Sequence, residues 1–395
     1  MSALAIGSVR RVQCAPEIPA LKRVYRCQCG RPVFFGNTQC LECGFALGYD
    51  PYAGDVFPLV PSEEEGLWNV APPIRRTARS YRRCANLLTP ASCNWIYHDS
   101  GTKGDQSGLC TACRLNRMIP DLSFEENAIH WGRIEAAKRR VLSLLVSLGL
   151  PVASRLSEDP ERGLAFDFLA SLAGEPVMTG HADGVITLNV AEADDATRER
   201  TRAEMREPYR TLVGHFRHEL GHYYWYRLVA DSPKLLDGFR EVFGDEREDY
   251  AAALRRNYSE GPRPDWQANF VSSYASVHPW EDWAETWAHY LHMIDAAGTA
   301  ASFGLHTTAG SLQFDRFTTA LLYKPRDPGA AAFLSQLNSW VELTAIMNEL
   351  SRSMGGHDLY PFALPKAAVS KLQFIHMVAC GANVTEGSLK PVRVS

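Results

Sequence analysis

The chain has 395 residues, of which 46% are hydrophobic and 22% are charged, and its formal net charge is −4. This composition fits a globular protein of two or three domains, and it excludes a largely disordered, collagen-like or coiled-coil chain. No stretch approaches the roughly 18 consecutive apolar residues that a membrane span needs, and the first residues lack the apolar core of a secretory signal. We therefore expect a cytoplasmic protein with no membrane partner.

Charge is spread unevenly along the chain. Residues 1–120 carry 14 Lys and Arg against 9 Asp and Glu, so the remainder is acidic. Five of the basic residues gather within nine positions, at Arg75, Arg76, Arg79, Arg82 and Arg83. A phosphate-binding patch is one interpretation, but the segment lacks the interleaved aromatic residues of single-strand binders. We favour a solvated face, or a face that docks on the acidic part of the chain, and expect no nucleic-acid partner.

Eight of the ten cysteines stand in groups within the first 113 residues. The first groups are Cys27-x-Cys29 and Cys40-x-x-Cys43, and a glycine follows each of them. A structural zinc ion takes four thiolates, and two paired cysteines on a tight turn supply half of that set. The string therefore predicts a four-cysteine zinc ribbon, with redox or disulfide use as the alternative.

The other clustered cysteines predict a second zinc site. They are Cys84, Cys93, Cys110 and Cys113, and only the last pair has the spacing of a zinc knuckle. His98 lies in the same segment and could replace one cysteine, although four cysteines suffice. Because each module is too short to hold a core without metal, we expect both zinc ions to be structural.

After residue 121 the pattern changes to helices and short strands. Apolar residues recur at helical spacing from about 124 to 149, while 166–170 and 185–190 have the character of strands. A long helix is predicted from Pro208 to about residue 230. We interpret the aromatic run 223–226 inside this helix as core packing.

The helix after Pro208 contains His218-Glu219-Leu220-Gly221-His222. Histidines four residues apart lie on one helical face and can bind the same zinc ion. Glu219 is offset by one position, so it can act on a water molecule as a general base instead of binding the metal. The motif lacks a third ligand.

A second helix, predicted to start at Pro279, offers that ligand. Glu281 and Glu285 lie four residues apart on it, and either carboxylate would complete a His₂Glu site with an open position. We favour Glu281 because it lies at the helix start, near Tyr274. The later acid then accepts a hydrogen bond from a ligand imidazole. The remaining histidines of this region, His215, His278, His289 and His292, are interpreted as structural.

The motifs together resemble a known group. HExxH on one helix and a glutamate on the next, in an E-x-x-x-(D/E) setting, resemble the gluzincin clan of zinc metallopeptidases. Tyr274, seven residues before Glu281, is similar to a tyrosine of the lethal-factor-like branch. The cysteine clusters followed by GHFRHELGHYYW and HPWEDWAETWAHYLH resemble a bacterial family of zinc-ribbon metallopeptidases over residues 25–295. This resemblance implies a metal set of His218, His222 and Glu281.

We therefore expect an α+β fold with two domains. A double zinc-ribbon module at residues 20–118 precedes a zincin-like metallopeptidase domain at residues 121–395, with a small sheet, an active-site helix and a mostly helical C-terminal half. The expected function is hydrolysis of a peptide or protein substrate with one catalytic and two structural zinc ions.

In the expected mechanism, Glu219 takes a proton from a zinc-activated water and passes it to the leaving amine. Tyr274 donates to the oxyanion, and strand 185–190 pairs with the substrate backbone. The alternative is a catalytically silent zincin scaffold that regulates or binds a partner through its zinc ribbons. Glu219, Glu281 and Tyr274 together favour the enzyme, because a scaffold needs no base.

Overall fold

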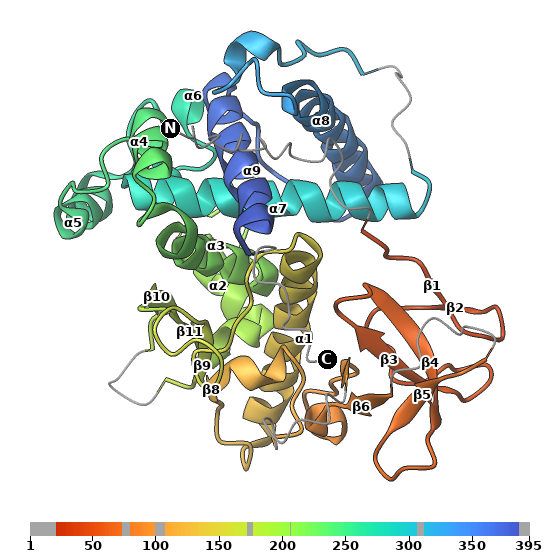
Figure 1. The fold of residues 1–395 in the computed structure, drawn as a ribbon. Helices are drawn as coiled ribbons and strands as arrows, with labels where there is room; N and C mark the ends of the chain where they lie inside the picture. Colours follow the sequence, from red (N-terminus) through yellow and green to blue (C-terminus); the bar gives the residue numbers. More distant parts are fainter. Residues whose placement is uncertain are drawn as a thin grey trace, which may run out of the picture.

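The computed structural model describes residues 21–72, 80–98, 107–171, 177–205, 207–305 and 312–386. An N-terminal part built of strands lies beside a larger part in which a small sheet lies at one side of a group of helices (Figure 1). Strands end at residue 189, and only helices and loops follow among the described residues. The protein is thus of mixed α+β class, as predicted.

A short hairpin and a five-stranded antiparallel sheet make up the N-terminal part. The hairpin and sheet strands are β1 (Tyr25–Arg26), β2 (Pro32–Val33), β3 (Ala46–Asp50), β4 (Asp55–Pro61), β5 (Trp68–Val70), β6 (Tyr81–Arg83) and β7 (Ile96–His98). The sheet order is β3-β4-β5-β6-β7. Its first strand also meets the segment before its last strand, where the Tyr49 N–H donates to the Asn94 carbonyl at 2.9 Å. The sheet is therefore strongly curled.

The sheet shares its buried residues with the larger part of the molecule, and the expectation that the cysteine modules need metal to hold a core stays a prediction. Leu47, Tyr49 and Trp95 are buried in one cluster with the cysteines. The strand pattern is hidden in the sequence because Gly48 and Pro58 interrupt it, and both residue types disfavour strand interiors. Gly48 is needed there, since a Cβ atom would lie 2.5 Å from a methyl group of Ile96.

Two of the five clustered arginines lie among the described residues. Arg75, Arg76 and Arg79 lie outside the described residues. Arg82 and Arg83 lie on β6, and the Arg83 guanidinium stands 5.0 Å from the ring centre of Trp68. Arg83 therefore packs against a neighbouring strand.

The sheet of the larger part has the order β10 (Gly180–Ala182), β11 (Val185–Asn189), β9 (Ala165–Leu169) and β8 (Asn116–Met118). The strands predicted at 166–170 and 185–190 are confirmed to within one residue. β11 pairs in parallel with β9 and antiparallel with β10, so both of its edges are occupied. The expectation that this strand pairs with a substrate is therefore wrong. The edge strands are β10 and β8, and β10 was not predicted because its three residues show no alternating pattern.

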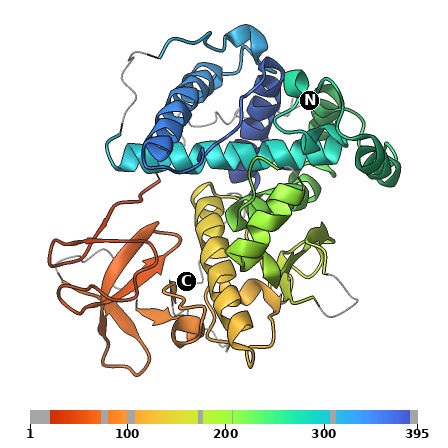
Figure 2. The same ribbon diagram turned by 180° about the vertical axis from the view of Figure 1, so that it is seen from behind.

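Helices pack beside this sheet and form the C-terminal half. They are α1 (Glu125–Ser147), α2 (Asp195–Glu204), α3 (Leu212–Tyr224), α4 (Pro233–Phe243), α5 (Tyr250–Glu260), α6 (Trp266–Asn269), α7 (Pro279–Ser302), α8 (Ala330–Ser353) and α9 (Lys366–Glu386). The long α7 separates α1, α2 and α3 from α8 (Figure 2). In the part of the chain described, no helix is long and apolar enough to cross a membrane.

Capping residues set the starts of α3 and α7, the two helices that carry the HExxH motif and the acidic residues after Pro279. Thr211 caps α3 by accepting the N–H of Gly214 at 3.0 Å, which begins the helix four residues after the predicted Pro208. α7 begins at Pro279, as predicted, and the His278 side chain caps it. α3 continues through a π-helical turn at Trp225–Val229.

A glycine lets α3 and α7 approach closely. A Cβ atom on Gly221 would lie 2.8 Å from the Cα atom of Ala284, closer than two such carbons can pack. The indole N–H of Trp283 also donates to the Gly221 carbonyl at 2.8 Å. This contact brings the histidine face of α3 against the acidic start of α7.

Candidate metal centres

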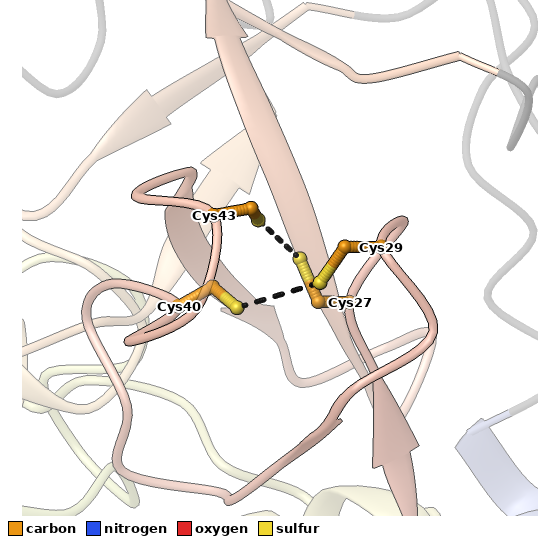
Figure 3. A group of neighbouring side chains, drawn as sticks. All are labelled: Cys27, Cys29, Cys40 and Cys43. Carbon is orange, nitrogen blue, oxygen red and sulfur yellow. Dashed lines mark hydrogen bonds between the residues drawn. The ribbon is translucent and has the colours of Figure 1, made fainter.

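The first four cysteines converge in the loops around β1 and β2. Figure 3 shows their sulfur atoms pointing toward one another. The Sγ atoms of Cys27 and Cys43 are 3.5 Å apart, and those of Cys29 and Cys40 are 3.8 Å apart. A disulfide would need about 2.05 Å, whereas ligands about 2.3 Å from a tetrahedral zinc ion lie about 3.8 Å apart. The cluster therefore fits a zinc ion and not a disulfide pair.

The second four cysteines form a fully buried group. Cys84, Cys93, Cys110 and Cys113 offer sulfur atoms within 4.8 Å of one another, and the Sγ atoms of Cys93 and Cys110 are 3.6 Å apart. The group has the geometry of a second four-thiolate site without any contribution from His98.

This second group borders α1. The carboxylate of Glu135 lies 3.9 Å from the Sγ atom of Cys113 and 2.7 Å from the Lys138 Nζ atom. Glu135 and Lys138 are both fully buried. The cysteine group therefore contacts α1 through Glu135, whose charge is paired with Lys138 of the same helix.

The third cluster lies where α3 meets α7. His218, His222 and Glu281 each offer a ligand atom within 4.8 Å of the others. Oε2 of Glu281 is 3.1 Å from Nε2 of His218 and 3.6 Å from Nε2 of His222. Ligand atoms about 2.05 Å from a tetrahedral zinc ion would lie about 3.3 Å apart. The observed separations bracket that value.

The two oxygen atoms of the Glu281 carboxylate have different surroundings. Its Oε1 accepts a hydrogen bond from the Tyr250 hydroxyl at 2.7 Å, whereas its buried Oε2 has no hydrogen-bond donor among the described residues. Burial alone would raise the pKa of Glu281, but His222 and His218 hold that pKa well below its usual value. A buried, ionised oxygen without a donor is what a cation would satisfy.

Glu285 lies one helical turn after Glu281 and contacts the candidate ligand His218. It does not belong to the group of ligand atoms that His218, His222 and Glu281 form. Its Oε1 is 2.6 Å from Nδ1 of His218, and its Oε2 accepts the hydroxyl hydrogen of Ser272 at 2.6 Å. This arrangement leaves Nε2 of His218 to face Glu281 and fixes the imidazole orientation.

Glu219 and Tyr274 lie at the same junction. The Glu219 side chain is buried, and burial raises the pKa of its carboxyl group. The ring of Tyr274 lies 6.0 Å from the ring of His218. Burial, followed by the charge of Glu281, raises the pKa of Tyr274, so its hydroxyl keeps its proton at neutral pH.

Sequence reasoning missed Tyr250 and His181 as neighbours of this cluster. Tyr250 stands 31 positions before Glu281 in a charged stretch without a motif. His181 lies on the edge strand β10, and its ring stacks against the ring of His222 at a centroid distance of 6.4 Å. Neither has a sequence signal of its own, because only the tertiary fold brings them to the site.

The other histidines have structural partners. The His289 Nδ1 atom lies 2.6 Å from the Tyr360 hydroxyl, and the His292 Nδ1 atom lies 2.6 Å from an Arg217 nitrogen. Burial lowers the pKa of His289 to about 4, so it is neutral at neutral pH. His278 caps α7, as described above, and likewise does not join the cluster.

His215 lies one turn before His218. Its Nε2 atom is 4.0 Å from a Glu192 oxygen, and burial lowers its pKa to about 4. It is a partly buried, neutral helix residue beside the cluster and not a member of it.

Two cysteine clusters and one His–Glu cluster on a mixed α+β scaffold are the features of a zinc-binding protein. The family described as "Putative zinc-binding metallo-peptidase" matches residues 127–378, more than half of the chain, and a zinc-ribbon domain matches residues 24–124. The chain therefore belongs to this metallopeptidase family. Proteins of Mycobacterium bovis and Mycobacterium tuberculosis, both named as uncharacterized, are 45% identical over 358 residues, which cover 90% of this chain and 95% of theirs. No solved structure matches the chain significantly.

Proposed function

We propose that the chain is a zinc-dependent peptide hydrolase of the gluzincin type, with His218, His222 and Glu281 holding the catalytic ion. The observation that carries the proposal is the convergence of their three ligand atoms at separations of 3.1 and 3.6 Å around an oxygen that lacks a donor. A zinc ion held there supplies Lewis-acid chemistry and an acidified water.

Glu219 is the proposed general base. It follows His218 directly, so it lies beside the ligand face of α3 without joining the ligand group. Burial raises the pKa of its carboxyl group, which makes the carboxylate a stronger proton acceptor near neutral pH. It accepts the proton of the attacking water and returns a proton to the leaving amine.

Tyr274 is the proposed donor to the carbonyl oxygen on which negative charge develops. A buried hydroxyl that keeps its proton can supply such a hydrogen bond without prior reorganisation. Tyr250 and Glu285 have positioning roles in this proposal, because each holds one of the proposed ligands in place.

The edge strand β10 is the proposed support for the substrate backbone. Among the described strands it pairs with β11 alone, and it carries His181 next to His222. An extended peptide that adds to this edge would run past the proposed metal site. The two cysteine groups are proposed to hold structural zinc ions that maintain the N-terminal part.

A cleavage assay tests the proposed function. The zinc-loaded full chain is incubated with a randomised peptide library, and new termini are read by mass spectrometry. We expect products from the native chain and none from the matched variant His222→Ala, which should keep its fold and two cysteine-bound zinc ions. If the folded, zinc-loaded native chain yields no products, the silent-scaffold alternative replaces the peptidase.

A further inference from the structure

Aromatic rings form an arc beside the proposed ligands. The ring of His181 stacks against that of His222, with planes 15° apart. Tyr226 stacks on His181 at a centroid distance of 5.8 Å, and Trp280 lies 6.1 Å from Tyr226. We call His181, Tyr226 and Trp280 the ring arc. The ring arc begins next to the proposed ligand His222 and ends at Trp280, which directly precedes the proposed ligand Glu281.

Tyr226 is the exposed member of the arc. Its side chain is 47% exposed, whereas the three aromatic residues before it are buried. The interpretation of the whole run 223–226 as core packing is therefore wrong for its last residue. Tyr226 lies in the π-helical turn that follows α3, and such turns are frequent at functional sites. An exposed ring next to a candidate catalytic centre is more simply a contact surface than a packing residue.

A peptide that pairs with the edge strand β10 would lie next to this arc. Side chains of a strand alternate between its two faces, so His181 lies on the face opposite to Gly180 and Ala182. A peptide strand that pairs with β10 places every second side chain on the face of His181, within contact distance of its cross-strand neighbour. Because His181 stacks on both His222 and Tyr226, that side chain belongs to a residue near the scissile bond.

We propose that the ring arc is the subsite for an aromatic side chain of the peptide, at a residue flanking the scissile bond. This inference rests on the proposed peptidase function and specifies its substrate class. Ring faces and edges attract a further aromatic ring beyond the gain from burial alone. The nearby Asp183 carboxylate, whose charge adds to burial in raising the pKa of Tyr226, repels an acidic side chain.

A binding measurement tests the subsite apart from turnover. The full-length Glu219→Gln chain, loaded with zinc, is titrated with fluorescent Gly-Ala decapeptides that carry Phe, Ala, Glu or Arg at the centre. We expect the Phe peptide to bind about tenfold tighter than the Ala peptide, or more. Adding Tyr226→Ala should remove this preference, and adding Tyr226→Phe should keep it. Tyr52→Ala, at a tyrosine that is 69% exposed in the N-terminal part, is the matched control and should change nothing.

The outcomes separate this inference from the proposed function. Equal affinity for Phe and Ala, tighter binding of Arg, or a Phe preference that survives Tyr226→Ala would overturn the aromatic subsite even if the native chain cleaves peptides. A Tyr226-dependent Phe preference in binding, with no cleavage of any library peptide by the native chain, would support the subsite and reject the hydrolase. Failure of every peptide to bind would overturn the subsite, and the library cleavage assay would then decide the hydrolase by itself.

Discussion

Arg23, which lies shortly before Cys27, donates to Asp295 on α7 at 2.8 Å. The same carboxylate accepts hydrogen bonds from Arg217 of α3 at 2.8 Å and from Arg140 of α1 at 3.0 and 3.1 Å. Arg217 directly precedes His218 in the chain. The buried Asp295 carboxylate thus connects the segment before Cys27 with α3 and α7, the two helices that carry the His–Glu cluster.

Replacing that acid should destabilise the whole chain. Asp295→Asn leaves three guanidinium groups around a neutral amide, and breaking a buried ion pair costs about 3–5 kcal/mol. We expect a loss of this size in the free energy of unfolding, measured by urea titration. The matched control is Asp358→Asn at the exposed pair with Arg352, where the bond lengths are 2.7 Å and the expected loss is at most about 1 kcal/mol. Similar small losses in both variants would show that the buried network does not hold the two parts together.

The proposed metal content is three zinc ions per chain. Elemental analysis should give three for the native chain and two for Cys110→Ser, in which the N-terminal part should also lose stability while the His–Glu site keeps its ion. His222→Ala should give two with the N-terminal part intact. One zinc ion per chain, together with disulfides among the eight clustered cysteines, would contradict the interpretation of the cysteine groups.

The HExxH spacing predicts that His218 and His222 share one helical face, because a residue and its fourth neighbour always do. Pro279 likewise predicts the start of α7. These features are local, so the sequence carries them. Spacing alone could not separate Glu281 from Glu285, whereas the fold does so through contacts: one acid faces both imidazoles and the other lies on Nδ1 of His218.

The sequence pattern did not predict features that depend on tertiary contacts or on very short strands. Tyr250 reaches Glu281 from a separate helix, α5, and the edge strand β10 has too few residues for any periodicity. The five-stranded sheet was hidden by Gly48 and Pro58, which suit a curled sheet but disfavour a strand in any local reading. The partner of Tyr250 lies far away in the chain, whereas β10 pairs with β11 across a short turn and is too short to show a pattern of its own.

Glu281 and Glu285 should respond differently to removal. Glu281→Ala takes away a proposed ligand and should yield a folded chain that lacks the third zinc ion. Glu285→Ala removes only the support of His218 and should weaken zinc binding by about 10–100-fold without abolishing it. Competition with a chromogenic chelator measures both affinities. A crystal structure with the Glu285 carboxylate at about 2 Å from the metal and Glu281 turned away would reverse the assignment.

Tyr250 and Tyr274 should separate positioning from transition-state stabilisation. Tyr250→Phe keeps the ring but removes the hydrogen bond to Oε1 of Glu281, so zinc affinity should fall by about 10–100-fold. Tyr274→Phe should leave zinc affinity unchanged and lower kcat by about 100–1,000-fold at an unchanged KM. Each variant is the control of the other. Loss of zinc affinity in Tyr274→Phe, with none in Tyr250→Phe, would exchange the two roles.

The most direct measurement of the central claim is the rate of peptide hydrolysis by the native chain and by Glu219→Gln at equal zinc content. The substitution preserves the size of the side chain but removes its ability to accept a proton, and Glu219 does not belong to the ligand group. We expect both proteins to hold three zinc ions and only the native chain to cleave peptides. Equal turnover by the two proteins, or loss of the third zinc ion in Glu219→Gln, would contradict the assignment of Glu219 as the base.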